Sequence, residues 1–289
     1  MVLGAGGILG EAWLSSFLAG LADGEGFDAR ECGQMIGTSA GSIVATRLAA
    51  GERLRRPPSR RTAAPEGAPG DAQGGGIVRT AARWGWAATA PLAPLATALA
   101  APGGAFLRSA LLARAPDTGR TLAGLRAEVD ASSARFDGRL RVCCVDKRYG
   151  RRVVFGAPGA PPASVGEAVA ASCAIPWVFA PVRIGEREYV DGGVWSVTNL
   201  DAAPARRDTR VLCLDPTASL TSALRQALRV AVAVELQVLR GRGARVDHVT
   251  PDDEAAGAMG TEFMAAGKAA AALGAGYAQG RRLATGAAS

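Results

Sequence analysis

Histidine is almost absent from this sequence, which holds a single one, His248, among 289 residues. An active site that needs a histidine base therefore has one candidate. Cysteine is scarce as well: there are five, none at Cys-x-x-Cys spacing, so no zinc-site pattern is present. The cysteines stand in apolar runs such as "RVCCV" and "VLCLD", which is typical of buried, unpaired thiols in a reducing compartment. We expect no metal and no other cofactor.

Long apolar runs and clustered aromatic residues are also missing. Although 48% of the residues are hydrophobic, no uninterrupted apolar stretch reaches the roughly 18 residues that a membrane-spanning helix needs. No charged segment followed by an apolar core and a cleavage site is seen at the start, so we expect a cytoplasmic protein. The net charge of +7 comes almost wholly from scattered arginines, and aromatic residues make up 5%. Without stacking aromatics among the cations, we predict no nucleic-acid binding.

What the sequence does have is a regular alternation of segments at its start. Residues 1–3 are predicted to be a strand, 4–10 a glycine-rich turn, and 11–22 a helix with apolar residues at helical spacing. A second strand at 35–36 and a helix over about 42–51 follow. This order predicts an α/β fold with a parallel sheet, and the length fits a single domain over residues 1–289.

The middle of the chain differs in composition. Residues 53–76 are rich in Pro, Gly and Arg and are predicted to form a flexible loop, and the apolar stretch at about 77–125 a helical cap. The cap is either a set of ordinary core helices or a lipid-facing lid. Further on, the sequence predicts a hairpin of strands 139–145 and 151–155, a helix over 165–173, a strand ending in "REYVDGG", a strand over 211–214, and two Ala-rich helices over 220–240 and 254–278.

The chemistry begins with "GTSAG", residues 37–41, between the second predicted strand and a helix. This is the G-x-S-x-G pattern of a nucleophile elbow, in which a serine sits on a sharp turn with its hydroxyl exposed. Gly37 and Gly41 permit the turn, and the start of the following helix favours negative charge near Ser39. A pattern this short also arises by chance, so the rest of the sequence decides its meaning.

A second glycine-rich segment, "GAGGILG" at residues 4–10, follows the first strand. A dinucleotide site would need a glycine where Leu9 stands, although Gly4, Gly6 and Gly10 keep a spaced variant of that pattern. Alternatively, the N–H groups of Gly6 and Gly7 form an oxyanion hole for an intermediate on Ser39. A tight turn without any ligand is the third possibility.

The third element, Asp191-Gly192-Gly193, ends a predicted strand. An aspartate there lies where the loops of a parallel sheet form active sites. With the glycine loop and the serine elbow before it, the segment "ASCAIPWVFAPVRIGEREYVDGGVWSVTN" resembles the patatin-like phospholipase family, over about residues 1–50 and 165–215. The resemblance implies a three-layer α/β fold with a largely parallel central sheet flanked by helices.

The resemblance also implies a serine lipid acyl hydrolase that works with a Ser–Asp dyad and no histidine. Ser39 matches the nucleophile and Asp191 the general base, and the oxyanion or binding positions are Gly6, Gly7, Gly10, Gly37, Gly41, Gly192 and Gly193. The expected partner is a lipid or ester substrate, of the phospholipase, lysophospholipase or esterase type. Apolar segments on both sides of Asp191 favour its burial, which would raise its pKa and make it a better base.

Two departures from the family pattern keep other functions open. Ala5 replaces a glycine, which is tolerable only with a negative φ, and Leu9 replaces a basic residue near the oxyanion hole. A weak or inactive lipid-binding protein is thus one alternative. The order Ser39, Asp191, His248 also fits a Ser-His-Asp α/β-hydrolase, although His248 stands in a polar, Pro-containing segment predicted to be an exposed loop.

Contact with a membrane surface is a further expectation from composition. The arginine-rich residues 53–61 and the segment with Trp84 and Trp86 suggest transient peripheral docking on anionic lipid. The sequence predicts no particular oligomeric state.

Overall fold

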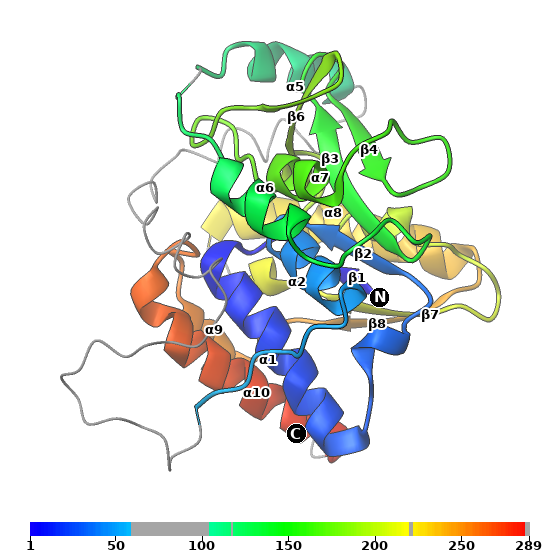
Figure 1. The fold of residues 1–289 in the computed structure, drawn as a ribbon. Coiled ribbons are helices and arrows are strands. Elements are labelled where there is room, and N and C mark those ends of the chain that lie inside the picture. The colour runs from blue at the N-terminus through cyan, green and yellow to red at the C-terminus, as the bar shows by residue number, and fades with distance from the viewer. Residues whose placement is uncertain (59–103, 117, 220–221, 287–289) are drawn as a thin grey trace.

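A mixed sheet forms the centre of the protein, whose computed structural model describes residues 1–58, 104–116, 118–219 and 222–286 (Figure 1). Hydrogen-bonded neighbours among the described strands run β5-β6-β3-β2-β1-β7-β8; β6 and β2 pair with successive parts of one edge of β3, and β4 pairs with its other edge. Strands β3, β2, β1, β7 and β8 run parallel, whereas β4 and β6 are antiparallel to β3. The bounds are β1 Val2–Leu3, β2 Met35–Thr38, β3 Leu140–Asp146, β4 Arg151–Phe155, β5 Val182–Ile184, β6 Arg187–Asp191, β7 Arg210–Leu214 and β8 Arg245–Val249.

Helices pack on both faces of this sheet because its strands are apolar on both sides. Leu3, Met35 and Val142 belong to one core cluster with residues of α1, α2, α7 and α10, and their neighbours Val2 and Ile36 to a second cluster with Leu239 of α8. This alternation is what the period of two in a strand requires. The helices are α1 Gly7–Glu25, α2 Ala40–Ala49, α5 Gly104–Ala113, α6 Ala123–Asp130, α7 Val165–Ser172, α8 Ser222–Gly241, α9 Asp253–Met259 and α10 Ala269–Ala284.

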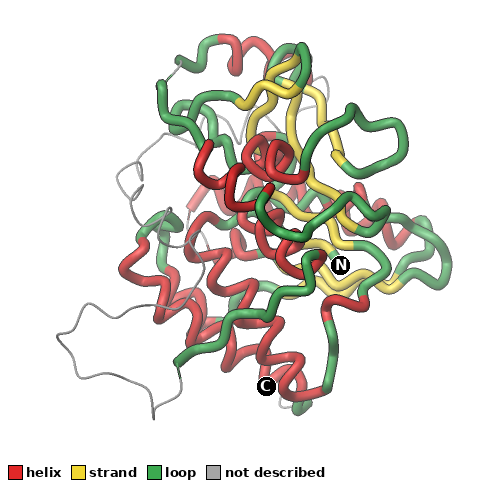
Figure 2. Tube along the Cα trace, in the orientation of Figure 1, coloured by secondary structure: helices red, strands yellow, loops and turns green. Residues whose placement is uncertain are grey.

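The predicted three-layer architecture is confirmed. Figures 1 and 2 show helices in front of and behind the strands, with α1 and α10 side by side along one layer. The hairpin of β3 and β4, helix α7 and the strand that ends at Asp191 also form as the sequence indicates. Within the described ranges, no helix is both long and apolar enough to cross a bilayer.

Three expectations from the sequence are wrong in detail. The glycine-rich turn is shorter than predicted, because α1 already begins at Gly7. The helix predicted over 254–278 is two helices, α9 and α10, separated at Gly260, whose φ of 63° is outside the helical region. His248 lies in strand β8 and not in an exposed loop. Most of the predicted loop over 53–76 and of the cap over 77–125, with Trp84 and Trp86, lies outside the described residues.

Candidate active site

Strand β3 brings the ends of two other strands to the same place. Cys143 pairs with Thr38 of β2 and, on its other side, with Val154 of β4. The next residue, Cys144, pairs with Val153 of β4 and with Asp191 of β6. Because β4 occupies one edge of β3 at both positions, β2 and β6 share the opposite edge. Ser39, which follows Thr38, therefore meets Asp191 where the two strands end.

The serine elbow has the strained backbone that its motif requires. Ser39 has φ 51° and ψ −119°, a conformation that few non-glycine residues adopt, and it stands immediately before α2. Its N–H donates to Ser172 Oγ at 2.9 Å, and its carbonyl accepts from Ser42 Oγ at 2.6 Å. The residue is 6% exposed. These contacts hold the strained turn from both sides.

Asp191 is a buried carboxylate that faces Ser39. The residue is 5% exposed, and its Oδ1 accepts the Gly193 N–H at 2.7 Å. Burial is the main influence and raises the pKa of Asp191 from 3.8 to about 7, although hydrogen bonds from the Gly193 N–H and the Ser39 side chain oppose the shift. A carboxyl group with this pKa exchanges protons near neutral pH, so it can accept a proton from a hydroxyl group that touches it.

The glycine loop contacts both the elbow and the aspartate segment. Gly41 N–H donates to Gly4 O at 3.1 Å, and Ala5 N–H donates to Val197 O at 2.7 Å. A Cβ placed on Gly193 would lie 3.7 Å from the Ala5 Cβ. The three motifs, far apart in the chain, thus form one contiguous group of loops at the carboxyl ends of β1, β2 and the antiparallel β6.

Two backbone donors of the glycine loop have no partner among the described residues. In the described part of the chain, the N–H groups of Gly6 and Gly7 meet no backbone acceptor. They lie at the start of α1, and Ser39 lies at the start of α2, so two helix N-termini contribute positive potential here. Gly7 has φ 57°, and a Cβ on Gly6 would lie 2.8 Å from Pro216 Cβ, so both positions suit glycine.

The other glycines of the motifs are packing positions. A Cβ on Gly37 would lie 2.4 Å from Ser42 Cα, and one on Gly41 would lie 2.0 Å from Leu3 O. A Cβ on Gly192 would lie 2.2 Å from Cys143 O, and one on Gly10 would lie 3.2 Å from Pro216 Cβ. Any side chain at the first three positions would push the elbow or the aspartate loop away from its neighbour.

The two departures from the expected glycine-loop pattern fit the structure. Among the described non-glycine residues, positive φ angles occur at Ser39, Trp177 and Asn199, so Ala5 does not need the left-handed conformation. Leu9 is fully buried in the core cluster around α1, and its N–H donates to Phe263 O at 3.0 Å. Its side chain therefore contributes to packing and not to the surface above Ser39.

One residue that sequence reasoning missed connects the elbow to the aspartate loop. Asn199 is fully buried, and its Nδ2 lies within hydrogen-bond distance of Thr38 Oγ1 at 3.1 Å, Gly192 O at 3.2 Å and Ser196 O at 2.6 Å. Its φ is 51°, a left-handed conformation that asparagine tolerates better than most residues. The only signal in the sequence was the asparagine itself, in the turn that follows Asp191-Gly192-Gly193.

Two further polar residues support this arrangement. Ser172, at the end of α7, accepts the Ser39 N–H and donates its hydroxyl to Cys143 O at 2.7 Å. Glu235 of α8 accepts hydrogen bonds from the Thr198 hydroxyl at 2.7 Å and the Leu200 N–H at 2.8 Å, on either side of Asn199. Both residues lie too far away in the sequence for a local pattern to indicate these contacts.

His248 does not join the serine and the aspartate. Strands β1 and β7 separate β8 from β2, which at about 4.8 Å per strand places β8 roughly 14 Å from the strand of Ser39. The His248 Nε2 faces Asp215 Oδ2 at 3.5 Å. A Ser-His-Asp triad through Ser39, Asp191 and His248 is therefore contradicted by the order of the strands.

The remaining reactive groups near the site are neutral thiols. Cys173 Sγ lies 4.0 Å from Ser42 Oγ, and burial raises the pKa of this thiol far above neutrality. Burial likewise raises the pKa of Cys144. Across the residues that the structure describes, no group of three or more His, Cys, Asp or Glu side chains is placed to hold a metal ion.

Comparison with known proteins agrees with the geometry. The family model described as "Patatin-like phospholipase" matches residues 1–204, which include the glycine loop, the serine elbow, the aspartate segment and Asn199. A search of curated proteins finds no match for this chain.

Proposed function

This chain belongs to the patatin-like phospholipase family, and membership of that family supports lipid acyl hydrolase activity. We propose that the protein is a serine hydrolase with a Ser39–Asp191 dyad. The observation that carries the proposal is the contact between Ser39 and a buried carboxyl group whose pKa is raised to about 7. The proposed substrate is the acyl ester of a lipid or of a smaller alcohol.

In the first half of the reaction, Ser39 becomes acylated. The Asp191 carboxylate takes the hydroxyl proton while Ser39 Oγ bonds to the ester carbonyl carbon. The Gly6 and Gly7 N–H groups, with the N-termini of α1 and α2, stabilise the negative oxygen of the tetrahedral intermediate. The intermediate then expels the alcohol, which receives the proton from Asp191 and leaves the acyl group on Ser39.

In the second half, water replaces the alcohol. Asp191 takes a proton from the water while the water oxygen bonds to the acyl carbon. A second tetrahedral intermediate forms, and the Gly6 and Gly7 N–H groups stabilise its negative oxygen. Its collapse breaks the bond to Ser39 Oγ, which recovers the proton from Asp191, and the carboxylic acid is released. Because Asp191 must be ionised to begin each half, we expect kcat/KM to fall as the pH drops below about 7.

Asn199 and Ser172 act as positioning residues in this proposal, since they touch the backbone and neighbours of the dyad. Ser172 fixes the Ser39 N–H, and Asn199 connects Thr38 to the Gly192 carbonyl. Both contacts are buried, so they set the relation between the ends of β2 and β6. Positioning of this kind can be worth several kcal/mol of activation free energy.

The test combines a serine-directed probe with an ester panel. Wild-type protein should react with a fluorophosphonate at Ser39 and hydrolyse short-chain p-nitrophenyl esters, and Ser39→Ala and Asp191→Asn should lose both reactions. The control is Ser133→Ala, which removes an exposed serine hydroxyl and should leave both unchanged. A panel of phospholipid, lysophospholipid and glyceride substrates then identifies the lipid class. Absence of probe label on Ser39 in folded protein would contradict the proposal.

A further inference from the structure

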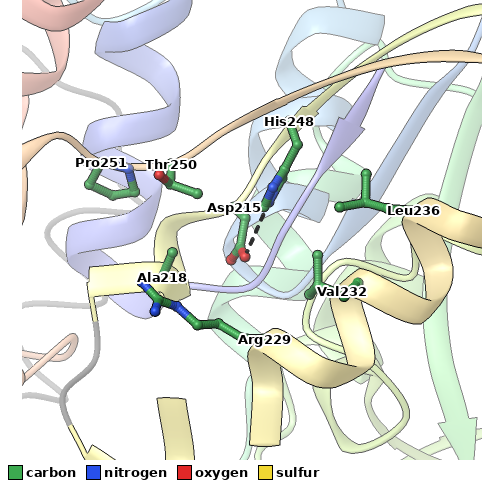
Figure 3. Close-up of a pocket in the computed structure, with 9 residues that line it drawn as sticks. Asp215, Ala218, Arg229, Val232, Leu236, His248, Thr250 and Pro251 are labelled. Carbon is green, nitrogen blue, oxygen red and sulfur yellow. Dashed lines mark ion pairs between the residues drawn. The ribbon is translucent and has the colours of Figure 1, made fainter. Parts of the chain in front are cut away.

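A cavity lies beside the sheet, next to the short 3-10 helix η4 (Pro216–Ser219). Its volume is about 290 Å³, near the lower end for pockets that hold small molecules. Figure 3 shows side chains of α8, η4 and the ends of β7 and β8 around it. The lining residues are Asp215, Ala218, Arg229, Val232, Ala233, Leu236, His248, Thr250 and Pro251, so neither Ser39 nor Asp191 takes part.

The acidic group of this cavity, Asp215, already has neighbours within the protein. Asp215 is 4% exposed, and its Oδ1 accepts both the Thr217 N–H at 3.0 Å and the Thr217 hydroxyl at 2.6 Å. Its Oδ2 faces His248 Nε2 at 3.5 Å (Figure 3). Because both oxygens have protein neighbours, Asp215 offers little to a cationic ligand.

The basic group, Arg229, has no ion-pair partner in the part of the chain that the structure describes. Arg229 is exposed, and among the described residues it meets no carboxylate within ion-pair distance. Figure 3 shows its side chain extending from α8 towards Ala218 at the edge of the cavity. The guanidinium group is therefore the charge that a ligand can use, and a carboxylate matches its planar set of donors.

The wall beside Arg229 is apolar, because Arg229, Val232 and Leu236 lie on one face of α8. Val232 and Leu236 project from α8 one turn apart, and Pro251 and Ala218 complete the surface. A ligand that fits has one carboxylate for Arg229 and a short aliphatic portion for this wall. The acid that ester hydrolysis releases has that composition.

We propose that the cavity between α8 and the ends of β7 and β8 binds a short-chain aliphatic carboxylate, the acid product of hydrolysis, through Arg229. The identity of the acid as product rests on the proposed function, whereas the site itself depends only on the contacts described above. The cavity is thus a second site for the product, apart from the serine at which the product forms.

The test measures binding without turnover. Sodium hexanoate is titrated into Ser39→Ala protein and followed by ligand-observed NMR, and Arg229→Gln is added in the same background. Losing one charge-assisted contact should weaken binding about tenfold. Arg242→Gln, which changes an exposed arginine of the segment after α8, is the matched control and should bind as the parent does. Ala233→Leu, which fills the cavity from an exposed position, should reduce binding as well.

Two outcomes would overturn the proposal. Equal hexanoate affinity in the Arg229→Gln and Arg242→Gln proteins would place any binding elsewhere, including at the acyl site near residue 39. Tighter binding of hexylammonium, which has the same chain with a positive head group, would show that Asp215 and not Arg229 dominates the cavity. Neither result bears on the fluorophosphonate reaction of Ser39, so failure of the cavity and failure of the proposed hydrolase are distinguishable.

Discussion

The buried charge of Asp191 should make the protein less stable as the pH rises, and Asp191→Asn should remove that dependence. The folded protein holds the Asp191 proton up to a pH of about 7, whereas the ordinary pKa of 3.8 applies in the unfolded chain. Between these two values the folded state binds more protons than the unfolded state. The free energy of unfolding therefore falls as the pH rises from about 4 to about 7 and then levels off.

The size of the effect follows from the two pKa values. A difference of about three pKa units corresponds to about 4 kcal/mol, which is large compared with the 5–15 kcal/mol of typical domain stability. Asparagine has nearly the same shape as aspartate, and its carbonyl oxygen can still accept the Gly193 N–H. Relative to wild type, Asp191→Asn should thus be of similar stability near pH 4 and more stable by several kcal/mol at pH 8.

Urea denaturation between pH 4 and 8 measures this difference. Asp208→Asn, at an exposed position, is the matched control and should follow the wild-type curve. Ser39→Ala should extend the falling part of the curve to higher pH, because it removes a hydrogen bond that lowers the Asp191 pKa. If Asp191→Asn and wild type stay parallel across the whole range, the carboxyl group is not buried as described and the argument for its basicity fails.

Substitutions at three other residues test the contacts of the dyad and the excluded histidine. Ser172→Ala removes the acceptor of the Ser39 N–H and a donor to the Cys143 carbonyl, so it should lower the free energy of unfolding by about 1–3 kcal/mol and slow phosphonylation of Ser39. Asn199→Ala and Asn199→Gly should both reduce kcat with little change in KM. In chemical denaturation the glycine variant should be about 1 kcal/mol more stable than the alanine variant, because glycine accepts the positive φ. His248→Ala should leave ester hydrolysis unchanged. A fall in kcat of this variant would indicate that His248 acts as the base and would contradict the dyad.

The local part of the site could be predicted from the sequence. The elbow and the glycine loop are turns between a strand and a helix. A Cβ on Gly37 would meet Ser42 of its own motif at 2.4 Å, and one on Gly41 would meet Leu3 of the adjacent strand at 2.0 Å, whereas Gly6 and Gly10 face the distant Pro216. The constraint on the elbow acts within one motif and its neighbouring strand, so the sequence pattern records it directly.

The contacts that hold the motifs together could not be predicted in the same way. Asn199 reaches Thr38 across 161 positions of the chain, and Ser172 reaches Ser39 across 133. These pairings depend on the register of β3 with β2 and β6, which a single sequence does not determine. Strand β8 was missed for a related reason: it ends the described strand order, so only Val246 of its five residues is buried and the apolar pattern is weak.

A raised pKa alone would not have identified Asp191, because a second buried carboxyl group has one too. Burial also raises the pKa of Glu235, although hydrogen bonds from Ser196 and Thr198 oppose the shift. Glu235 is held by the Thr198 hydroxyl and the Leu200 N–H, and no contact joins it to Ser39 in the described structure. Glu235 therefore supports the turn that contains Asn199, whereas Asp191 lies at the end of β6 and contacts Ser39 of the elbow.

Glu235→Gln separates these two roles. Glutamine keeps an acceptor for Thr198 and Leu200, so the turn should persist, and the pH at which fluorophosphonate labelling of Ser39 reaches half its maximum should stay where wild type has it. Asp191→Asn, in contrast, should abolish the labelling at every pH. A shift of the labelling midpoint in Glu235→Gln would mean that the charge of Glu235 affects the ionisation on which Ser39 reactivity depends. Asp191 could then not be assigned as the base from its contact with Ser39 alone.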